Sequence, residues 1–142
     1  MARYLVDANV LSEPTKRFPS KAVVEWVGQH ESGFAVNPII LGELRYGMLI
    51  LPAGRRRKRL ETWFAQATGF LQVLQLDRET GDIWAVLLAD LKKKGRAMPV
   101  KDSLIAATAL QHGLTIATRN TNDYRHTGAR LVNPFEPNLS EP

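Results

Sequence analysis

The chain has 142 residues, of which 44% are hydrophobic and 23% charged, and it contains no cysteine. Its length suits one domain, and its apolar content is that of an ordinary globular protein rather than of a disordered chain. Without cysteine, disulfide frameworks, thiolate metal sites and thiol nucleophiles are excluded. A metal ion would have to be held by oxygen ligands or by the three scattered histidines, His30, His112 and His126.

The formal net charge of +5 is distributed unevenly along the chain. Nine of the 19 Lys and Arg residues lie in two short clusters, at 55–59 and 92–96, which leaves ten basic residues against 14 acidic ones elsewhere. Such concentration of positive charge indicates a polyanionic partner, and the acidic remainder indicates a separate acidic site. The alternative is that both clusters are solvated helix ends.

The N-terminal segment reaches a carboxylate, Asp7, after only three residues of Tyr, Leu and Val. This run is far shorter than the apolar core of a signal peptide or the ~20 apolar residues that cross a bilayer. We therefore expect a cytoplasmic protein that does not contact the membrane.

In the first half of the chain, two short strands alternate with helices. A β-type run at 3–6 is followed by apolar residues at helical spacing over 21–30, and 34–36 reads as a second strand. An asparagine N-cap and a first-turn proline then predict a helix at 38–51.

The second half continues the same alternation. It begins with a basic amphipathic helix at 55–69 and a strand at 71–76, and Asp77 can cap a helix that stops at Gly95. The remaining predicted elements are a helix at 102–112, closed by a glycine, and strands at 114–118 and 130–132.

Strands that are separated by helices pair in parallel through right-handed crossovers. The alternation therefore predicts an α/β fold in which helices cover both faces of a parallel sheet. We expect one domain over 1–135, followed by a mobile C-terminal tail at 136–142.

Two candidate site residues stand at the starts of elements. Asp7 directly follows the first strand, at the sheet edge where ligands of parallel α/β proteins gather. Asp102 opens a helix and can point to the same edge. Each also has a purely structural interpretation, because Asp7 can terminate a strand and Asp102 can serve as a helix N-cap or first-turn acid.

Glu43 interrupts an apolar helix. Its neighbours at three and four residues include Ile39, Ile40 and Tyr46, so its carboxylate projects from an apolar stripe. A buried unpaired carboxylate costs several kcal/mol or takes up a proton, and we therefore expect a cationic group beside it. A structural salt bridge to Arg45 or another arginine is the alternative to a functional role.

A run of polar residues follows the strand at 114–118, and it includes the candidate site residues Asn120 and Asp123. Both residue types are also common in turns, so a purely structural interpretation is the alternative. Carboxylates from separate α/β units that meet at one sheet edge raise each other's pKa values unless a divalent cation neutralises them. Ligation by oxygen alone indicates Mg²⁺ or Mn²⁺. The chemistry that follows is metal-assisted attack of water on a phosphodiester.

Five segments carry a family resemblance: YLVDANVLSE at 4–13, NPIILGELRYG at 37–47, PVKDSLIAATA at 99–109, TRNTNDY at 118–124 and LVNPF at 131–135. With these segments in this order, the chain resembles the PIN-domain ribonucleases, and within them the VapC-type toxins of bacterial toxin–antitoxin pairs. The resemblance implies a three-layer α/β/α sandwich around a short parallel sheet. It also implies a Mg²⁺- or Mn²⁺-dependent endoribonuclease that hydrolyses RNA.

By this resemblance, the first three family acids fall on Asp7, Glu43 and Asp102, and the fourth polar position falls on Asn120 or on nearby Asp123. We expect Asp7 and Asp102 to bind one ion, with Glu43 completing its ligands and helping to position or deprotonate the attacking water. An asparagine at the fourth position argues against a second tightly bound metal, because an amide carries no charge.

The resemblance also implies groups that support the site and partners that bind the chain. Asn9, Ser12 and Thr118 are similar to family residues that orient the acids. The implied partners are an RNA substrate, a second copy of the chain and a cognate antitoxin whose C-terminal segment covers the acidic site. Exposed apolar residues on the basic helix are candidates for antitoxin contacts unless they are core residues, namely Trp63, Phe64 and Phe70.

Two other functions remain open from the sequence. An aspartate after a strand is similar to the nucleophile loop of aspartyl-phosphate phosphatases, but Asn9 stands where those enzymes carry a second acid. The other alternative is a non-catalytic module that binds nucleic acid or a protein partner through its basic clusters, with structural acids.

Overall fold

The computed structural model describes residues 1–136. One sheet of five parallel strands has the order β3-β2-β1-β4-β5. The strands are β1 (Tyr4–Val6), β2 (Phe34–Val36), β3 (Gln72–Val73), β4 (Thr115–Ala117) and β5 (Leu131–Val132). The helices are α1 (Ala8–Leu11), η1 (Glu13–Thr15), α2 (Lys21–His30), η2 (Glu31–Gly33), α3 (Pro38–Leu49), α4 (Arg55–Thr68), α5 (Arg78–Lys93), α6 (Val100–His112) and α7 (Thr121–Tyr124).

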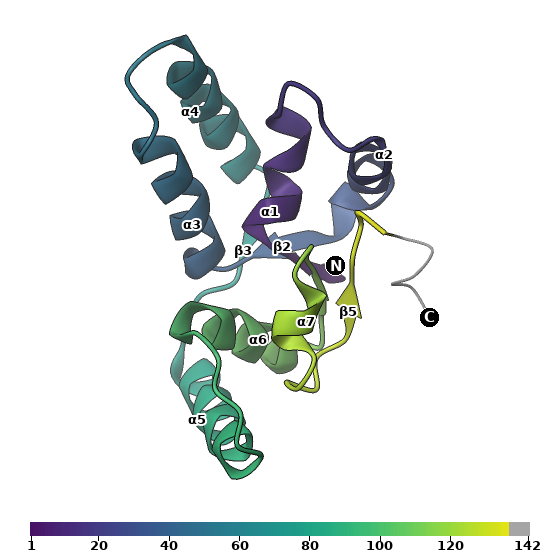
Figure 1. Cartoon of the computed structure of the whole chain (residues 1–142), viewed down its shortest axis with the longest axis vertical. Coiled ribbons are helices and arrows are strands. Elements are labelled where there is room, and N and C mark those ends of the chain that lie inside the picture. Colours follow the sequence, from purple (N-terminus) through teal and green to yellow (C-terminus); the bar gives the residue numbers. More distant parts are fainter. Residues whose placement is uncertain (137–142) are drawn as a thin grey trace.

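Helices cover both faces of this sheet. Figure 1 shows the strands in the middle of the molecule, with α1, α2 and α4 on one side and α5 and α6 on the other. The predicted three-layer α/β/α architecture with a parallel sheet is therefore confirmed. Every residue of β1 and β2 is buried, which is why these strands read as continuous apolar runs rather than as alternating ones.

Most predicted elements are present, with shorter strands. The helix at Lys21–His30 has the predicted bounds, whereas the strand predicted at 71–76 is reduced to Gln72–Val73. Helix α6 begins at Val100, so Asp102 lies inside its first turn and not at its N-cap. The four-residue helices α1 and α7 were not predicted, because one turn is too short to show helical periodicity.

The aromatic residues in and after the basic helix α4 differ in burial. Trp63 and Phe64 are partly buried and pack against the core, which agrees with the interpretation of these two as core residues. Phe70 lies beyond the end of α4 and is fully exposed, with 92% of its surface accessible. The amphipathic pattern of α4 turns the two aromatic rings toward the core, while most of its arginines stay exposed.

Within residues 1–136, no helix is long and apolar enough to span a membrane. The tail predicted at 136–142 lies outside the described residues except for Glu136, whose backbone N–H donates to the carbonyl of Asn133.

Asn37 joins the two helices that carry site residues. Its side-chain oxygen caps α3 by accepting a hydrogen bond from Ile40 N at 2.9 Å, and its amide nitrogen donates to Thr108 Oγ1 on α6 at 2.9 Å. The Asn37 side chain is inaccessible to water. One side chain therefore fixes where α3 begins and holds α3 against α6.

We predict that Asn37→Ala lowers the free energy of unfolding by about 2 kcal/mol, because it removes both a helix cap and a buried hydrogen bond. Urea denaturation followed by circular dichroism measures this loss. Asn37→Ser is the control, since serine caps helices but is too short to replace the bond to Thr108, and it should recover part of the loss. Equal stabilities of Asn37→Ala and the wild type would contradict the role given to Asn37.

Candidate active site

The site lies where the order of the strands reverses. From β1 the chain builds outward through β2 and β3 on one side, and then crosses to add β4 and β5 on the other. The carboxyl ends of β1 and β4 lie side by side, with Val6 opposite Ala117, and the following residues are Asp7 and Thr118. In open parallel sheets, ligands bind in the crevice at this switch point.

Asp7 is held in place by both neighbouring segments. Its Oδ1 accepts from Ala8 N at 2.8 Å, at the start of α1, and its Oδ2 accepts from Thr118 Oγ1 at 2.8 Å. Only 6% of Asp7 is exposed. Burial raises the pKa of Asp7; the Thr118 hydrogen bond opposes this shift, and the charges of Glu43 and Asp102 add to it.

Asn9 ties the two loops together around this carboxylate. Its amide nitrogen lies 3.4 Å from both Asp7 Oδ2 and Thr118 Oγ1, and its oxygen accepts from Arg119 N at 3.1 Å. Thr118 and Asn9 therefore contact Asp7 as supporting groups should. Ser12 instead uses its backbone carbonyl, which accepts from Thr15 Oγ1.

Glu43 projects from the middle of α3 and is 24% exposed. Its Oε2 accepts from Lys101 Nζ at 2.8 Å, so the cationic neighbour expected from the sequence is present. The structural alternative, a salt bridge from Glu43 to Arg45 or another arginine, is not found among the described ion pairs, and Arg45 instead pairs with Glu61 on α4 at 3.4 Å. The apolar stripe expected around Glu43 is only partly buried, since Tyr46, one turn further along the helix, is 65% exposed.

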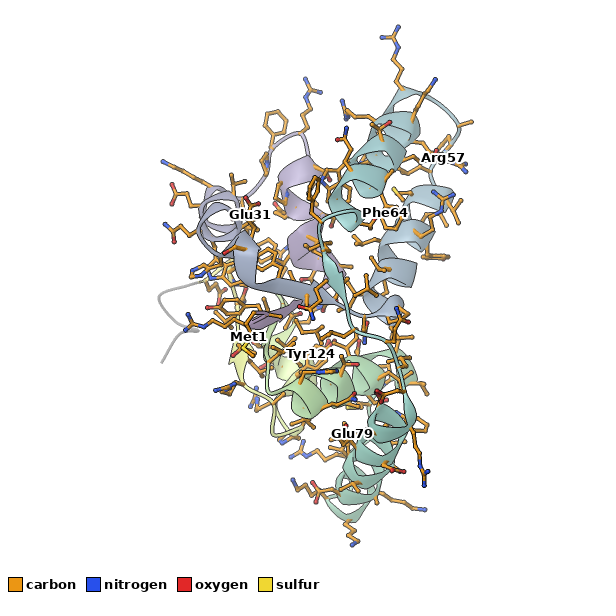
Figure 2. All side chains as sticks on the ribbon, turned by 180° about the vertical axis from the view of Figure 1, so that it is seen from behind. Met1, Glu31, Arg57, Phe64, Glu79 and Tyr124 are labelled. Carbon is orange, nitrogen blue, oxygen red and sulfur yellow. The ribbon has the colours of Figure 1, made fainter. Side chains whose placement is uncertain are left out.

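Asp102 lies in the first turn of α6 and is partly buried. Burial raises its pKa; the charge of Lys101 opposes this shift, and the charges of Glu43 and Asp123 add to it. The hydroxyl of Tyr124 donates to Asp102 Oδ1 at 3.3 Å. Tyr124 is buried, and Figure 2 shows it toward the middle of the molecule.

Asn120 is the N-cap of α7, which follows β4, and Asp123 lies on this helix. Both are exposed, and the backbone N–H of Asn120 donates to Thr118 Oγ1 at 3.1 Å. Asp123 is close enough to Asp102 for its charge to raise the pKa of that carboxyl. Each residue thus neighbours the acids in a different way, and which of them takes the fourth polar position stays a prediction.

The fold thus brings Asp7, Glu43 and Asp102 from three separate segments into electrostatic range of one another. Within residues 1–136, however, no three His, Asp or Glu side chains converge closely enough to chelate one ion. The donor set still suits a divalent cation, because Glu43 Oε1 is shielded from water and has no hydrogen-bond partner among the described residues. A carboxylate oxygen that is buried and unpaired is available as a ligand.

The two basic clusters lie toward opposite ends of the long axis, on α4 and at the end of α5 (Figure 1). Arg56 lines a hollow of about 260 Å³ together with Asn9 and Glu43. Arg96 lines another, of about 370 Å³, together with Asp123. Figure 2 shows Arg57, from the first cluster, near the outer end of the helix pair α3 and α4. Positive charge therefore flanks the acids on two sides.

Two residues that contact the candidate acids, Lys101 and Tyr124, were not predicted from the sequence. Both are adjacent in sequence to predicted site residues, since Lys101 precedes Asp102 and Tyr124 follows Asp123. A lysine in the first turn of a helix is a usable signal, because the helix dipole disfavours a cation there. The contact of Tyr124 has no comparable local signal, since it depends on how α7 packs against α6.

Comparisons with known proteins agree with this geometry. The PIN domain family matches residues 4–129. The chain is 36% identical over 138 residues to the VapC ribonuclease Y4jK of Sinorhizobium fredii, covering 94% of this chain and 98% of that protein. It is 32% identical over 135 residues to the toxin FitB of Neisseria gonorrhoeae, covering 92% and 97%.

The fold has a similar match among solved structures. The crystal structure of FitAcB from Neisseria gonorrhoeae superposes with a TM-score of 0.81 at 32% sequence identity, over 93% of this chain and 98% of that one. The matching family model spans the strands β1 and β4, α3 and α6, and with them all three carboxylates. The chain therefore belongs to the PIN-domain family, among the VapC-type toxin ribonucleases.

Proposed function

We propose that this chain is the toxin of a toxin–antitoxin pair and an endoribonuclease that hydrolyses RNA with Mg²⁺ or Mn²⁺ at Asp7, Glu43 and Asp102. One observation carries the proposal. In a chain of this family, three carboxylates from β1, α3 and α6 meet at the sheet's switch point closely enough to influence one another's charge. Clustered carboxylates of this kind need a cation to neutralise them.

The residues of the site have different proposed roles, and the surroundings of each residue determine its role. Asp7 and Asp102 would hold the ion, and a divalent ion supplies Lewis acidity that favours deprotonation of water and stabilises charge on a phosphate. Glu43 has one unpaired oxygen with which to position the attacking water or accept its proton. Thr118 and Asn9 keep the Asp7 carboxylate in one orientation throughout.

The RNA backbone would lie along the two basic clusters, at 55–59 and 92–96. Most of these side chains are exposed and have no acidic neighbour to neutralise them fully; Arg57, which pairs with Glu61 at 3.3 Å, and Lys94, which pairs with Asp90 at 2.9 Å, are the exceptions among the described ion pairs. Contacts to phosphates position a strand without reading its sequence.

A cognate antitoxin is the protein partner that this function requires. Trp63 and Phe70 line a groove of about 720 Å³ with Leu11, Pro14 and Val27, which offers an apolar surface to an inserted partner segment. A homodimer is also part of the proposal, and Tyr46 on α3 and Ile50 at its C-cap are large exposed residues suited to it. We place the toxin in the cytoplasm, where its RNA substrates are.

The alternative functions fit the site less well. An aspartyl-phosphate phosphatase needs a second acid two residues after its nucleophile, and here Asn9 uses both ends of its amide to tie Asp7, Thr118 and Arg119 together. A non-catalytic binding module has no use for the shielded, unpaired oxygen of Glu43.

We predict that Asp102→Asn reduces Mg²⁺-dependent RNA cleavage on the order of 100-fold or more, because a lost metal ligand removes several kcal/mol of transition-state stabilisation. Cleavage of a labelled RNA, followed on denaturing gels, measures the rate. Asp82→Asn removes an exposed acid on α5 and is the matched control, with unchanged activity expected. Wild-type cleavage by Asp102→Asn would show that Asp102 is not a metal ligand, and absence of cleavage by the wild-type chain itself would favour the binding-module alternative.

Asp7→Asn tests the electrostatic cost of the site through stability. Because folding raises the pKa of Asp7 from its ordinary value near 3.8, the folded state binds the proton more tightly, and stability falls as the pH rises through this window. Without divalent ions, Asp7→Asn should melt about 3 °C above the wild type at pH 7.5, a shift equivalent to about 1 kcal/mol. The difference should shrink toward pH 4; a variant that melts lower at pH 7.5 would refute the argument.

Reversing the charge of the exposed arginines Arg55, Arg56 and Arg59 to Glu tests the RNA path. Affinity for single-stranded RNA should fall, and the slope of log K against log salt should become shallower by about 0.7 for each lost phosphate contact. Fluorescence anisotropy at several salt concentrations measures both. An unchanged salt slope would show that this cluster does not contact the phosphates.

A further inference from the structure

Lys101 is the one basic side chain among residues 1–136 that forms an ion pair with a site carboxylate. Its ammonium group lies 2.8 Å from Glu43 Oε2, and its charge also acts on Asp102 and is acted on by Asp7. Its one contact is with Glu43 on α3, and its charge is coupled to Asp102 on α6 and to Asp7 after β1. A pair formed only for surface solubility would have no such coupling to two further acids.

The position of Lys101 in its helix is unfavourable for stability. It is the second residue of α6, where the unpaired N–H groups already carry partial positive charge and a cation is disfavoured. An exposed ion pair such as Lys101–Glu43 stabilises a fold by at most about 1 kcal/mol. Helix stability thus does not account for a lysine here, whereas the charge balance of the site does.

The charges of the site fit one divalent ion rather than two. When ionised, Asp7, Glu43 and Asp102 carry three negative charges, and Lys101 contributes one positive charge. The remaining net charge of two negative is neutralised by one divalent cation. The fourth polar position of the family offers a neutral amide in Asn120, and Asp123 acts on Asp102 through its charge without being one of the proposed ligands. A second divalent ion would leave the centre with excess positive charge.

We propose that Lys101 is a built-in cation of the active site, which takes the place of a second metal ion and contacts the phosphate of the bound RNA. In the resting protein its ammonium group holds Glu43. Its side chain is 56% exposed, so it can reach an incoming phosphate from the solvent side. The inference rests on the proposed function and adds to it the number of ions and the identity of a phosphate-binding residue.

The test combines metal binding with catalysis. Isothermal titration with Mn²⁺, without RNA, should give one ion for each wild-type chain. Lys101→Met should bind that ion more tightly, on the order of tenfold, because a nearby positive charge has been removed. At saturating Mn²⁺ the same variant should cleave RNA on the order of 100-fold more slowly, and Lys101→Arg should restore much of the rate. A residue with a merely structural role would not raise metal affinity while lowering the rate.

Lys94→Met is the control for metal affinity, because it removes a similarly exposed lysine from an ion pair of similar length, with Asp90, outside the acid cluster. Its affinity for Mn²⁺ should equal that of the wild type. Two ions for each wild-type chain, or an unchanged or weaker affinity in Lys101→Met, would overturn the role of Lys101 alone. Undiminished cleavage by Lys101→Met would remove the phosphate contact. If the wild type binds no Mn²⁺ at all, the proposed metal-dependent function itself fails, and this inference with it.

Discussion

A buried carboxylate at the end of the central strand is the constraint on which the rest of the structure depends. Asp7 is 6% exposed, and its ionised form is costly to bury, so both oxygens are engaged by donors from two different loops. Those loops follow β1 and β4, which pair directly at the switch point of the sheet. The same arrangement that makes the carboxylate tolerable also brings Glu43 and Asp102 beside it.

Much of this fold follows from local pattern. The start of helix α2 is predictable from the sequence because Ser20 caps it. The start of α3 is predictable because Asn37 and Pro38 are both suited to a helix N-terminus. The bounds of the strands are less predictable, since β3 and β5 contain two residues each and their edges depend on which neighbours remain paired. The aromatic residues in and after α4 show the same limit, because only tertiary packing against the core decides that Trp63 is partly buried and Phe70 is exposed.

The acids proposed for the site stand out in the sequence, whereas the cation beside them does not. Asp7, Glu43 and Asp102 stand out because each is a carboxylate in a place where burial is expensive. The partner of Glu43 is set by how α3 and α6 pack, which selects Lys101 although Arg45 is nearer in sequence. An ion pair between residues 58 positions apart leaves no periodic signal along the chain. Only the three-dimensional structure shows that Lys101 lies beside the acids, and the net charge behind the single-ion inference depends on that contact.

The hydrogen bond from Asn37 to Thr108 has a consequence for how the enzyme tolerates change. It couples α3, which carries Glu43, to α6, which carries Asp102, so the spacing of the two carboxylates is inherited from a side chain that touches neither of them. A substitution at either buried residue that weakens this hydrogen bond would change the distance between the two carboxylates, although it lies in the core. Core positions of this kind therefore tolerate fewer substitutions than packing alone would allow. Selection for catalysis acts on them as well as selection for folding.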